Sequence, residues 1–498
     1  MNLHEIIHHA IQYLMLFGPV SYFCTMKKAF HLHLYRFLLV LVSVLTPFLN
    51  FGQNSGHRIS FDLSGQNDSS YILVCHYGNK IHLVDSATKN SAGLVTFEGN
   101  EHLPGGVYVL ANKKRNKLIE FIVSNNQHFS IEADFSGDDF RINAPDDDVN
   151  SMFFKQISIS NSANKELSAW KTKLEAGLIN EDRYAKISDS LNHIIKQFRT
   201  TVIDSFPDSF ISILFRAMKE TDIPEEIKGN AEKSYHYFKN HYWDNFLLSD
   251  DRLLRSPIFQ PKLDFYFKQL VPPVPDSVIH SIDRVISLTG NNEEVRDYLI
   301  WHFASEYQNS TIMGMDKVFV HMADNYFSKY SVANTSPSVL EKIKERADQL
   351  RLLLIGKTAP DIWLIDTTGN YRSFREIKNE FTVLLFWDHE CGVCKKEMDA
   401  LINIYKSGTI DMEVFAIGTN GKLDGWKDYL IRYRLPWINV NGTRSLNADF
   451  HDLYDIYGTP VIYLLDKEKR IIAKRIKAEQ ISLVIENYRM NNQNPLFR

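Results

Sequence analysis

Three patterns of hydrophobic and polar positions follow one another along the chain. In the first, residues 58–143, short runs of alternating apolar and polar residues are separated by turn residues such as Pro104-Gly105-Gly106. Alternation with a period of two predicts half-buried strands, and several such strands joined by short turns predict a small antiparallel β-sandwich. The expected strands are residues 59–63, 71–76, 80–84, 106–110, 118–123 and 129–133.

The second pattern is helical and follows a boundary at Pro145 and the three acidic residues after it. Apolar residues recur there at helical spacing and Pro and Gly separate the runs, which predicts an α-helical domain over residues 150–354. Asp316, His321 and Asp324 lie in one of its segments, but we expect helix packing and a solvated face there rather than a metal site. The expected helices include residues 152–173, 182–199, 225–248 and 337–354.

The third pattern, over residues 356–490, alternates short apolar strands with helices. Residues 383–387 form an apolar run, and Met398, Leu401 and Tyr405 then recur at helical spacing. This order predicts a C-terminal α/β domain, so the expected fold class is multidomain: a β-sandwich, a helical domain and an α/β domain. Further expected elements are strands at 412–417 and 436–440, an apolar strand headed by Pro460 that runs to Leu465, and a helix at 426–433.

The first 53 residues are expected to form a signal region rather than part of the fold. Residues 1–26 contain no Lys or Arg, whereas Met26 is followed by Lys27, Lys28 and the apolar run 37–42, the order found in secretory signals. The apolar run is shorter than the roughly 20 residues that span a bilayer. We therefore expect Met26 to be the start and the mature chain to lie in the periplasm or cell envelope.

Composition adds little to this picture. The chain has 498 residues, a formal net charge of −4 and 44% hydrophobic residues, which fits about three domains and gives no electrostatic reason to expect nucleic-acid binding. The cysteines matter more, because two of the four stand in the segment Cys391-Gly392-Val393-Cys394, directly after an apolar strand.

This Cys-x-x-Cys pair carries the candidate chemistry. Such pairs also occur in zinc sites, haem attachment sites and structural disulfides. A zinc site needs a second ligand pair, but Cys24 and Cys75 lie far upstream, and haem attachment needs a His where Lys395 stands. At the expected strand-to-helix junction, unpaired backbone N–H groups and the helix dipole stabilise a thiolate, which is the form that attacks a disulfide.

With its neighbouring motifs, the pair resembles the thioredoxin superfamily, and within it the TlpA/ResA-like thiol-disulfide oxidoreductases of the bacterial envelope, which have a C-terminal domain of the AhpC/TSA-redoxin type. The resemblance covers residues 356–489, and the upstream parts resemble the β-domain and helical region of multidomain members. The matching segments are Gly356-Lys357-Thr358-Ala359-Pro360, Phe386-Trp387, Cys391-Gly392-Val393-Cys394, Lys395-Lys396-Glu397 and Thr459-Pro460.

The resemblance implies a thioredoxin fold and a role for each matching residue. Cys391 is the attacking thiol and Cys394 the resolving thiol. Pro460 is a cis-proline that faces them, and it forms the expected substrate-binding set with Thr459 and Trp387.

Glu397 matches an acid that exchanges protons with the cysteines, but the residues equally allow an exposed helix carboxylate without that role. No cofactor and no metal is implied. The expected partners are protein disulfide substrates and an unidentified membrane electron donor, with a homodimer as a further option.

The chain departs from the family pattern beside the cysteines. Glu390 replaces the usual Trp before Cys391, and a carboxylate there opposes thiolate formation, whereas Lys395 and Lys396 favour it. The net effect on the pKa of Cys391 therefore stays open. His389 is expected to be a solvated loop residue rather than a base.

The expected function is a periplasmic thiol-disulfide oxidoreductase that reduces protein disulfides, with the direction taken from the resemblance alone. Two alternatives are a disulfide oxidant or isomerase of the same fold and a non-enzymatic binding scaffold. A peroxidase is disfavoured, because Asp388 stands where a peroxidatic cysteine needs a Thr.

Overall fold

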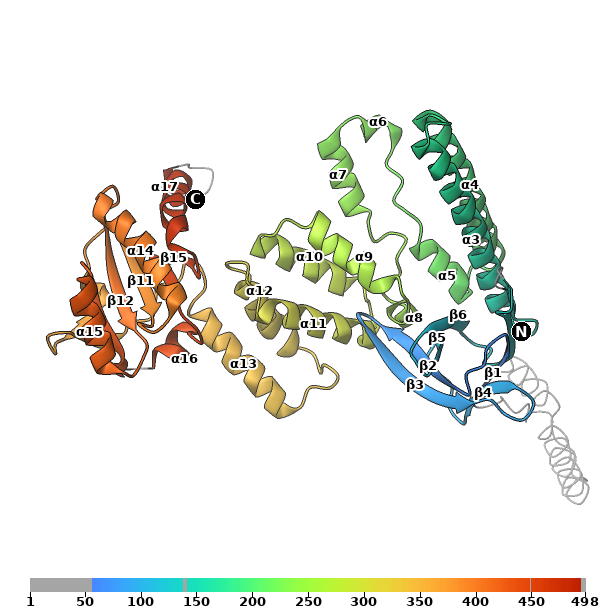
Figure 1. Ribbon diagram of the computed structural model, residues 1–498, viewed down its shortest axis with the longest axis horizontal. Coiled ribbons are helices and arrows are strands. Elements are labelled where there is room, and N and C mark those ends of the chain that lie inside the picture. Colours follow the sequence, from blue (N-terminus) through green and yellow to red (C-terminus); the bar gives the residue numbers. More distant parts are fainter. Residues whose placement is uncertain (1–55, 138–140, 448, 494–498) are drawn as a thin grey trace, which may run out of the picture.

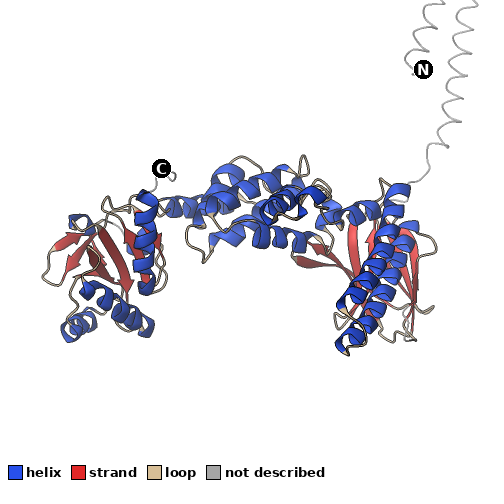
Figure 2. Cartoon of the chain, turned by 90° about the horizontal axis from the view of Figure 1, so that it is seen from above, coloured by secondary structure: helices blue, strands red, loops and turns tan. Residues whose placement is uncertain are grey.

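The computed structural model describes residues 56–137, 141–447 and 449–493. Three parts follow one another in space as they do in the sequence: a β-sandwich at one end, helices in the middle and an α/β domain at the other end (Figures 1 and 2). The expected multidomain fold is confirmed. The expected signal region, residues 1–53, lies outside the described residues. Within the described part, none of the helices combines the length and the apolar character that crossing a membrane requires.

The sandwich consists of two four-stranded sheets, ordered β4-β1-β7-β8 and β3-β2-β5-β6. Phe61, Phe97 and Phe121 are fully buried between the sheets and pack edge to face. All six expected strands are present, together with β4 and β8, but β1 and β7 pair in parallel, so the sandwich is not antiparallel throughout. The strands are β1 (His57–Ser64), β2 (Ser70–Tyr77), β3 (Lys80–Thr88), β4 (Leu94–Gly99), β5 (Gly106–Asn112), β6 (Lys117–Val123), β7 (His128–Asp134) and β8 (Arg141–Asn143).

The helical part begins where the side chain of Asp147 caps α3 by accepting the N–H of Asn150. Residues 225–248 were expected to form one helix, which is wrong: Gly229 ends α6, Asn230 caps α7, and turns follow. The other expected helices are confirmed. The helices are α3 (Asp148–Glu175), α4 (Glu181–Ser205), α5 (Phe210–Ala217), α6 (Glu225–Lys228), α7 (Ala231–Asn240), α8 (Asp251–Leu254), α9 (Phe259–Phe265), the π-helix η2 (Tyr266–Leu270), α10 (Pro275–Ser287), α11 (Glu293–Gln308), α12 (Asp316–Met322), the π-helix η3 (Ala323–Phe327) and α13 (Pro337–Arg351).

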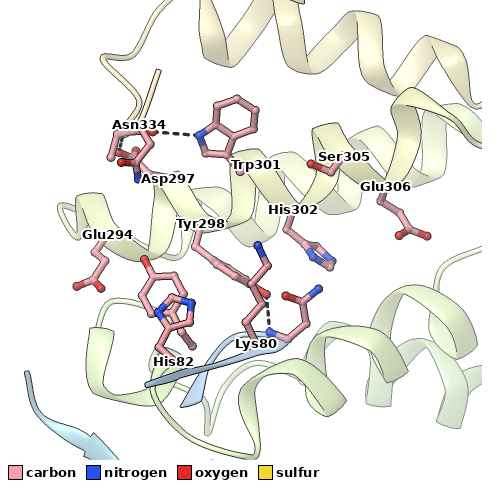
Figure 3. Close-up of a pocket in the computed structure, with 13 residues that line it drawn as sticks. Lys80, His82, Glu294, Asp297, Tyr298, Trp301, His302, Ser305, Glu306 and Asn334 are labelled. Carbon is pink, nitrogen blue, oxygen red and sulfur yellow. Dashed lines mark hydrogen bonds between the residues drawn. The ribbon is translucent and has the colours of Figure 1, made fainter. Parts of the chain in front are cut away.

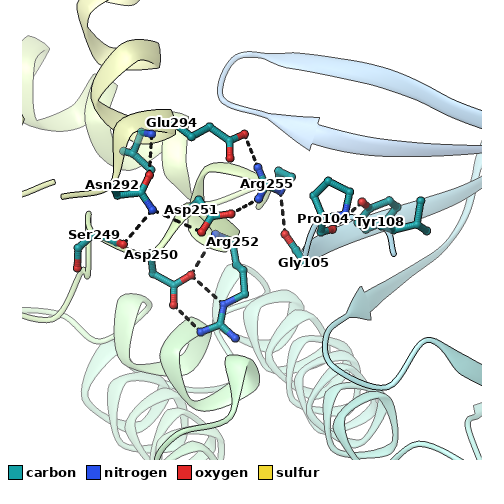
Figure 4. Close-up of polar contacts among 12 residues, drawn as sticks. Pro104, Gly105, Tyr108, Ser249, Asp250, Asp251, Arg252, Arg255, Asn292 and Glu294 are labelled. Atoms are coloured by element: carbon teal, nitrogen blue, oxygen red, sulfur yellow. Dashed lines mark hydrogen bonds and ion pairs between the residues drawn. The ribbon is translucent and has the colours of Figure 1, made fainter. Parts of the chain in front are cut away.

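One continuous apolar core joins the sandwich to the helices. Arg255, which follows α8, reinforces this junction with a guanidinium that is only 5% exposed. Its Nε donates to the carbonyl of Gly105 at 2.9 Å, and its terminal nitrogens pair with Asp251 and Glu294 (Figure 4). The sandwich and the helical part therefore pack as one body.

The C-terminal part is built on a seven-stranded sheet ordered β10-β9-β13-β12-β11-β14-β15. β11, β12 and β13 are parallel, and β14 runs antiparallel beside β11. Apolar residues of α14 and α17 cover one face, and those of α16 cover the other. The elements are β9 (Trp363–Asp366), β10 (Tyr371–Ser373), the 3₁₀ turn η4 (Phe374–Glu376), β11 (Phe381–Trp387), α14 (Gly392–Ser407), β12 (Met412–Gly418), α15 (Leu423–Tyr433), β13 (Ile438–Ser445), α16 (Phe450–Tyr454), β14 (Val461–Leu465), β15 (Ile471–Lys474), the 3₁₀ turn η5 (Ala478–Gln480) and α17 (Ile481–Gln493).

Charged side chains join the helical part to this domain. Asp316 of α12 pairs with Lys474 of β15, and both side chains are largely buried. Asp455, at the end of α16, accepts two hydrogen bonds from Arg346 of α13 and one from Arg475 at 2.6 Å. The helix packing expected for this segment is confirmed, but Asp316 lies in a largely buried ion pair rather than on a solvated face.

Candidate active site

The two cysteines of the Cys-x-x-Cys pair lie at the junction between β11 and α14, as the sequence predicts. Cys391 is the N-cap residue of α14, and its Sγ accepts the backbone N–H of Cys394 at 3.2 Å. Cys391 is partly exposed, whereas Cys394 lies in the core with 1% of its surface exposed. Both are free thiols. The Cys391 sulfur can therefore contact an external molecule, whereas the Cys394 sulfur is buried in the core.

The surroundings shift the pKa values of the two thiols in opposite directions. Partial burial raises the pKa of Cys391, but hydrogen bonds from the Cys394 thiol and backbone N–H outweigh it and hold the pKa below its ordinary value. Burial, followed by the hydrogen bond that its thiol donates to Cys391, raises the pKa of Cys394 to about 11. The exposed sulfur is thus the one that ionises first and can act as the nucleophile.

The Thr459 carbonyl lies against the exposed sulfur, and Pro460 follows it in the chain. The Thr459–Pro460 peptide bond is cis, as the resemblance implies. The Cys391 thiol donates to the carbonyl oxygen of Thr459 at 3.6 Å. Both residues are partly exposed at the start of β14, so the backbone of this loop and Cys391 face the same patch of solvent.

The acidic residue before the pair is neutralised by partners that the sequence analysis missed. Glu390 pairs with Lys422 at 2.8 Å and accepts from the side-chain amide of Asn420 at 3.0 Å. These bonds, with Lys422 first, hold the pKa of Glu390 below its ordinary value. The opposition between Glu390 and thiolate formation, which the sequence leaves open, is therefore weakened by Lys422.

A usable signal for these partners was present in the sequence. Asn420 and Lys422 follow β12, which pairs in parallel with β11, so their loop emerges at the same sheet edge as Cys391. Asn420 also donates to Asp388 at 3.1 Å, which ties the segment before the cysteine to the next loop.

His389 differs from its expected position. Its side chain is only 8% exposed, rather than solvated. The ring packs against Gly425 of α15, where a β-carbon would lie 2.6 Å from Nε2, so the absence of a side chain at Gly425 makes room for it. Tertiary packing that local sequence does not encode therefore decides the position of His389.

Trp387 also differs from its expected role. It is the last residue of β11, has no exposed surface, and packs against Tyr429 with ring centroids 5.2 Å apart. A side chain with no exposed surface cannot contact a substrate at the protein surface. Trp387 is instead a core residue beneath the cysteine segment, which corrects its place in the substrate-binding set.

Glu397 lies one turn beyond Cys394 on α14 and is partly buried. Its carboxylate accepts the backbone N–H of Ala478 at 2.7 Å, at the start of η5. Glu397 is thus not a freely exposed carboxylate. The bond to Ala478 holds it on the helix face that carries Cys394.

Two regions of the chain match models of known protein families. Residues 355–474 match the AhpC/TSA family, and residues 179–352 match a domain of unknown function, DUF5106. The thiol-disulfide oxidoreductase ResA of a Bacillus cereus strain is 27% identical over 137 residues, which cover 27% of this chain and 76% of that protein. The thioredoxin-like protein YneN of Bacillus subtilis is 28% identical over 120 residues, covering 24% of this chain and 68% of that protein.

Solved structures also match parts of the chain. A domain of a possible thiol-disulfide isomerase from Cytophaga hutchinsonii is 35% identical, covers 28% of this chain and 96% of its own, and aligns with a TM-score of 0.27. A thioredoxin-like protein from Bacteroides caccae is 20% identical, covers 54% of this chain and 98% of its own, and aligns with a TM-score of 0.43.

Proposed function

We propose that this chain, which belongs to the thioredoxin superfamily as a TlpA/ResA-like thiol-disulfide oxidoreductase, reduces protein disulfides. The proposed reaction takes place outside the cytoplasm. The observation that carries this proposal is the contrast between the two thiols. Cys391 is accessible, has a lowered pKa and faces the Thr459–Pro460 loop, whereas Cys394 is buried and has a raised pKa.

The proposed reaction has two steps. The Cys391 thiolate attacks one sulfur of a substrate disulfide, the substrate S–S bond breaks, and the leaving sulfur takes a proton. Cys394 then loses its proton and attacks the Cys391 sulfur, which breaks the mixed disulfide and releases the second substrate sulfur as a thiol. The substrate gains two electrons and two protons, and the protein is left with a Cys391–Cys394 disulfide. An external dithiol donor must reduce that disulfide before the next cycle.

Cys394 must lose its proton in the second step, although its pKa is about 11 in the dithiol form. We assign proton exchange at this step to Glu397, which lies on the same face of α14, and its bond to Ala478 fixes it there. If Glu397 only holds η5, Glu397→Gln will leave the pH profile of the resolving step unchanged. If it exchanges the proton, the same change will slow that step and shift its profile to higher pH.

Thr459 and Pro460 are proposed to bind the substrate. An extended segment lying along this loop would place its disulfide against Cys391, and the exposed side chains of Val393 and Tyr457 offer apolar contact on either side. Trp387 takes no part in this contact, because it is buried.

The proposed setting is the periplasm or cell envelope, reached through the signal in residues 1–53. There the donor would be a membrane dithiol protein and the substrates would be protein disulfides. We also propose that the protein can form a homodimer, and we assign no surface to the contact between its two copies.

The direction of the reaction is tested by the reduction potential of the Cys391–Cys394 pair, measured by equilibration against dithiol and glutathione buffers. A reductase gives a value near that of thioredoxin, about −270 mV, whereas an oxidant gives a value nearer about −120 mV. Insulin reduction supplies the activity readout. Cys391→Ser abolishes it, and Cys75→Ser, a change to a buried thiol in the β-sandwich, leaves it unchanged.

A further inference from the structure

β3 is an exposed edge strand. It forms the outer strand of its sheet and pairs with β2 from Lys80 to Thr88, while no other strand among the described residues pairs with its second side. Two large apolar side chains project from it into solvent, Ile81 at 63% exposure and Leu83 at 68%. Edge strands of this length are normally covered or guarded, because their free N–H and C=O groups recruit another strand.

A cavity of about 590 Å³ opens beside the same strand. Lys80 and His82 form one side of it, and Tyr298, Trp301 and His302 of α11 form the other (Figure 3). The ring of Tyr77 stacks on His82 with centroids 5.1 Å apart, and that of Tyr298 stacks on His302 at 5.8 Å. Such a wall of rings suits an aromatic side chain.

The strand register links the edge to the cavity. Lys80 pairs with Tyr77 and His82 with Cys75, so these four side chains share one face of the hairpin, whereas Ile81 and Leu83 point to the other face. A strand added beside β3 would have the same alternation. Every second side chain of it would lie on the cavity face, and the side chains between them would lie beside Ile81 and Leu83.

The walls of the cavity are held in place before any ligand arrives. The backbone N–H of Asn79 donates to the Tyr298 hydroxyl at 3.0 Å, and that hydroxyl donates to Gln260 at 2.7 Å. Gly78 packs so closely on the Tyr298 ring that a β-carbon would lie 2.0 Å from it. Trp301 donates to the carbonyl of Ala333 at 3.0 Å. A preformed site loses less entropy on binding.

We infer that β3 and this cavity bind an extended segment of the substrate polypeptide by strand addition, with one aromatic side chain in the cavity. The inference rests on the proposed function, because the occupant is a segment of the polypeptide whose disulfide is reduced. Strand addition supplies the affinity and the cavity supplies the preference for an aromatic residue.

The test uses the full chain and a fluorescein-labelled peptide, Lys-Thr-Val-Phe-Val-Thr-Lys, in an anisotropy titration. The double variant Ile81→Lys with Leu83→Lys, which changes only exposed side chains, is expected to weaken binding at least tenfold. A peptide with Ala in place of Phe is expected to bind the wild-type chain more weakly by a similar factor. The matched control is Leu178→Lys, an equally exposed residue at the end of the α3–α4 turn, and it should bind as the wild type does.

Two results would overturn the inference. One is peptide binding that is absent or identical in the wild type and the double variant. The other is a dimer in sedimentation that the double variant dissociates, because the occupant of β3 would then be a second copy of this chain. Repeating the titration with Cys391→Ser separates this inference from the redox proposal, since docking does not need the thiol. Conversely, the double variant should reduce a small disulfide such as oxidised glutathione at the wild-type rate.

Discussion

The helical part of the chain makes two junctions, and they are built differently. Toward the β-sandwich it shares one continuous apolar core, with the buried guanidinium of Arg255 across the boundary. Toward the α/β domain the cores are separate, and the contacts that cross include two ion pairs, Lys474 with Asp316 and Arg346 with Asp455. The sandwich and helices therefore form one body, and the α/β domain forms a second body held to it by ion pairs.

The difference matters for the redox chemistry. Asp455, which the helical part holds through Arg346, lies four residues before Thr459, the residue whose carbonyl contacts Cys391. The charged junction is thus the one through which the upstream domains can influence the active site. The apolar junction has no such route, because it lies at the other end of the helical part (Figure 1).

Two buried thiols report on the two bodies separately. Cys75 is 8% exposed in β2, and Cys394 is 1% exposed in the α/β domain. Each becomes reactive only when its own surroundings open, so alkylation in increasing urea, followed by mass spectrometry, gives a free energy of unfolding for each body.

The largest effect is expected from Arg255→Ala. The change leaves Asp251 and Glu294 without their shared cation and the carbonyl of Gly105 without its donor. We expect the free energy of unfolding at Cys75 to fall by about 3 kcal/mol, at the low end for breaking a buried pair because both carboxylates are partly exposed. The free energy of unfolding reported by Cys394 should be unchanged. Arg58→Ala, which removes an exposed pair with Glu98, is the control and should cost less than about 0.5 kcal/mol.

The next effect concerns the thiols of the second body. At pH 8 a thiol with a pKa of about 11 is ionised to about 0.1%, whereas Cys391, with a pKa below its ordinary value of 9.0, is ionised to at least about 10%. Iodoacetamide should therefore modify Cys391 at least about 100-fold faster than Cys394 in the native dithiol protein. The rate at Cys391 should rise with pH with a midpoint below pH 9, because its pKa is held below the ordinary value. Equal rates at the two sulfurs would contradict the assignment of the nucleophile.

Asp455→Asn should have a smaller effect, confined to the second body. The amide keeps the shape but removes the charge that two guanidinium groups share, and Asp455 is buried. We expect a loss of about 2 kcal/mol in the free energy of unfolding at Cys394. An equal loss at Cys75 would show that the two bodies unfold as one, which would break the comparison.

The smallest effect is expected from Arg475→Met. This guanidinium is 52% exposed, and Asp455 keeps its paired bonds to Arg346 when it is removed. The unfolding free energy at Cys394 should fall by less than about 1 kcal/mol. A loss as large as that of Asp455→Asn would mean that Arg475, rather than the link to the helical part, carries the stability at this junction.

Local sequence predicted the elements that carry the chemistry. The apolar run of β11, the helical spacing after Cys394 and the Thr459-Pro460 pair are short-range signals, and the structure has each of them where expected. The break at Gly229 and Asn230 was missed, although a Gly followed by an Asn is itself a local signal for the end of one helix and the N-cap of the next.

The remaining features depend on contacts between distant residues. The parallel pairing of β1 with β7 and the contact of Asp455 with Arg346 join segments that no local pattern connects. The order of β11 and β12 predicts that the loop of Lys422 lies near Glu390, but the ion pair between the two side chains and the burial of Trp387 depend on tertiary packing.

The central claim is that Cys391 attacks and Cys394 resolves, and trapping the intermediate tests it most directly. The Cys394→Ser chain is mixed with native insulin, whose disulfides are intact, and the products are mapped by mass spectrometry. The account predicts a stable mixed disulfide between Cys391 and insulin in the Cys394→Ser chain, and none in the Cys391→Ser chain. A mixed disulfide formed through Cys394 in the Cys391→Ser chain, with none at Cys391, would contradict it.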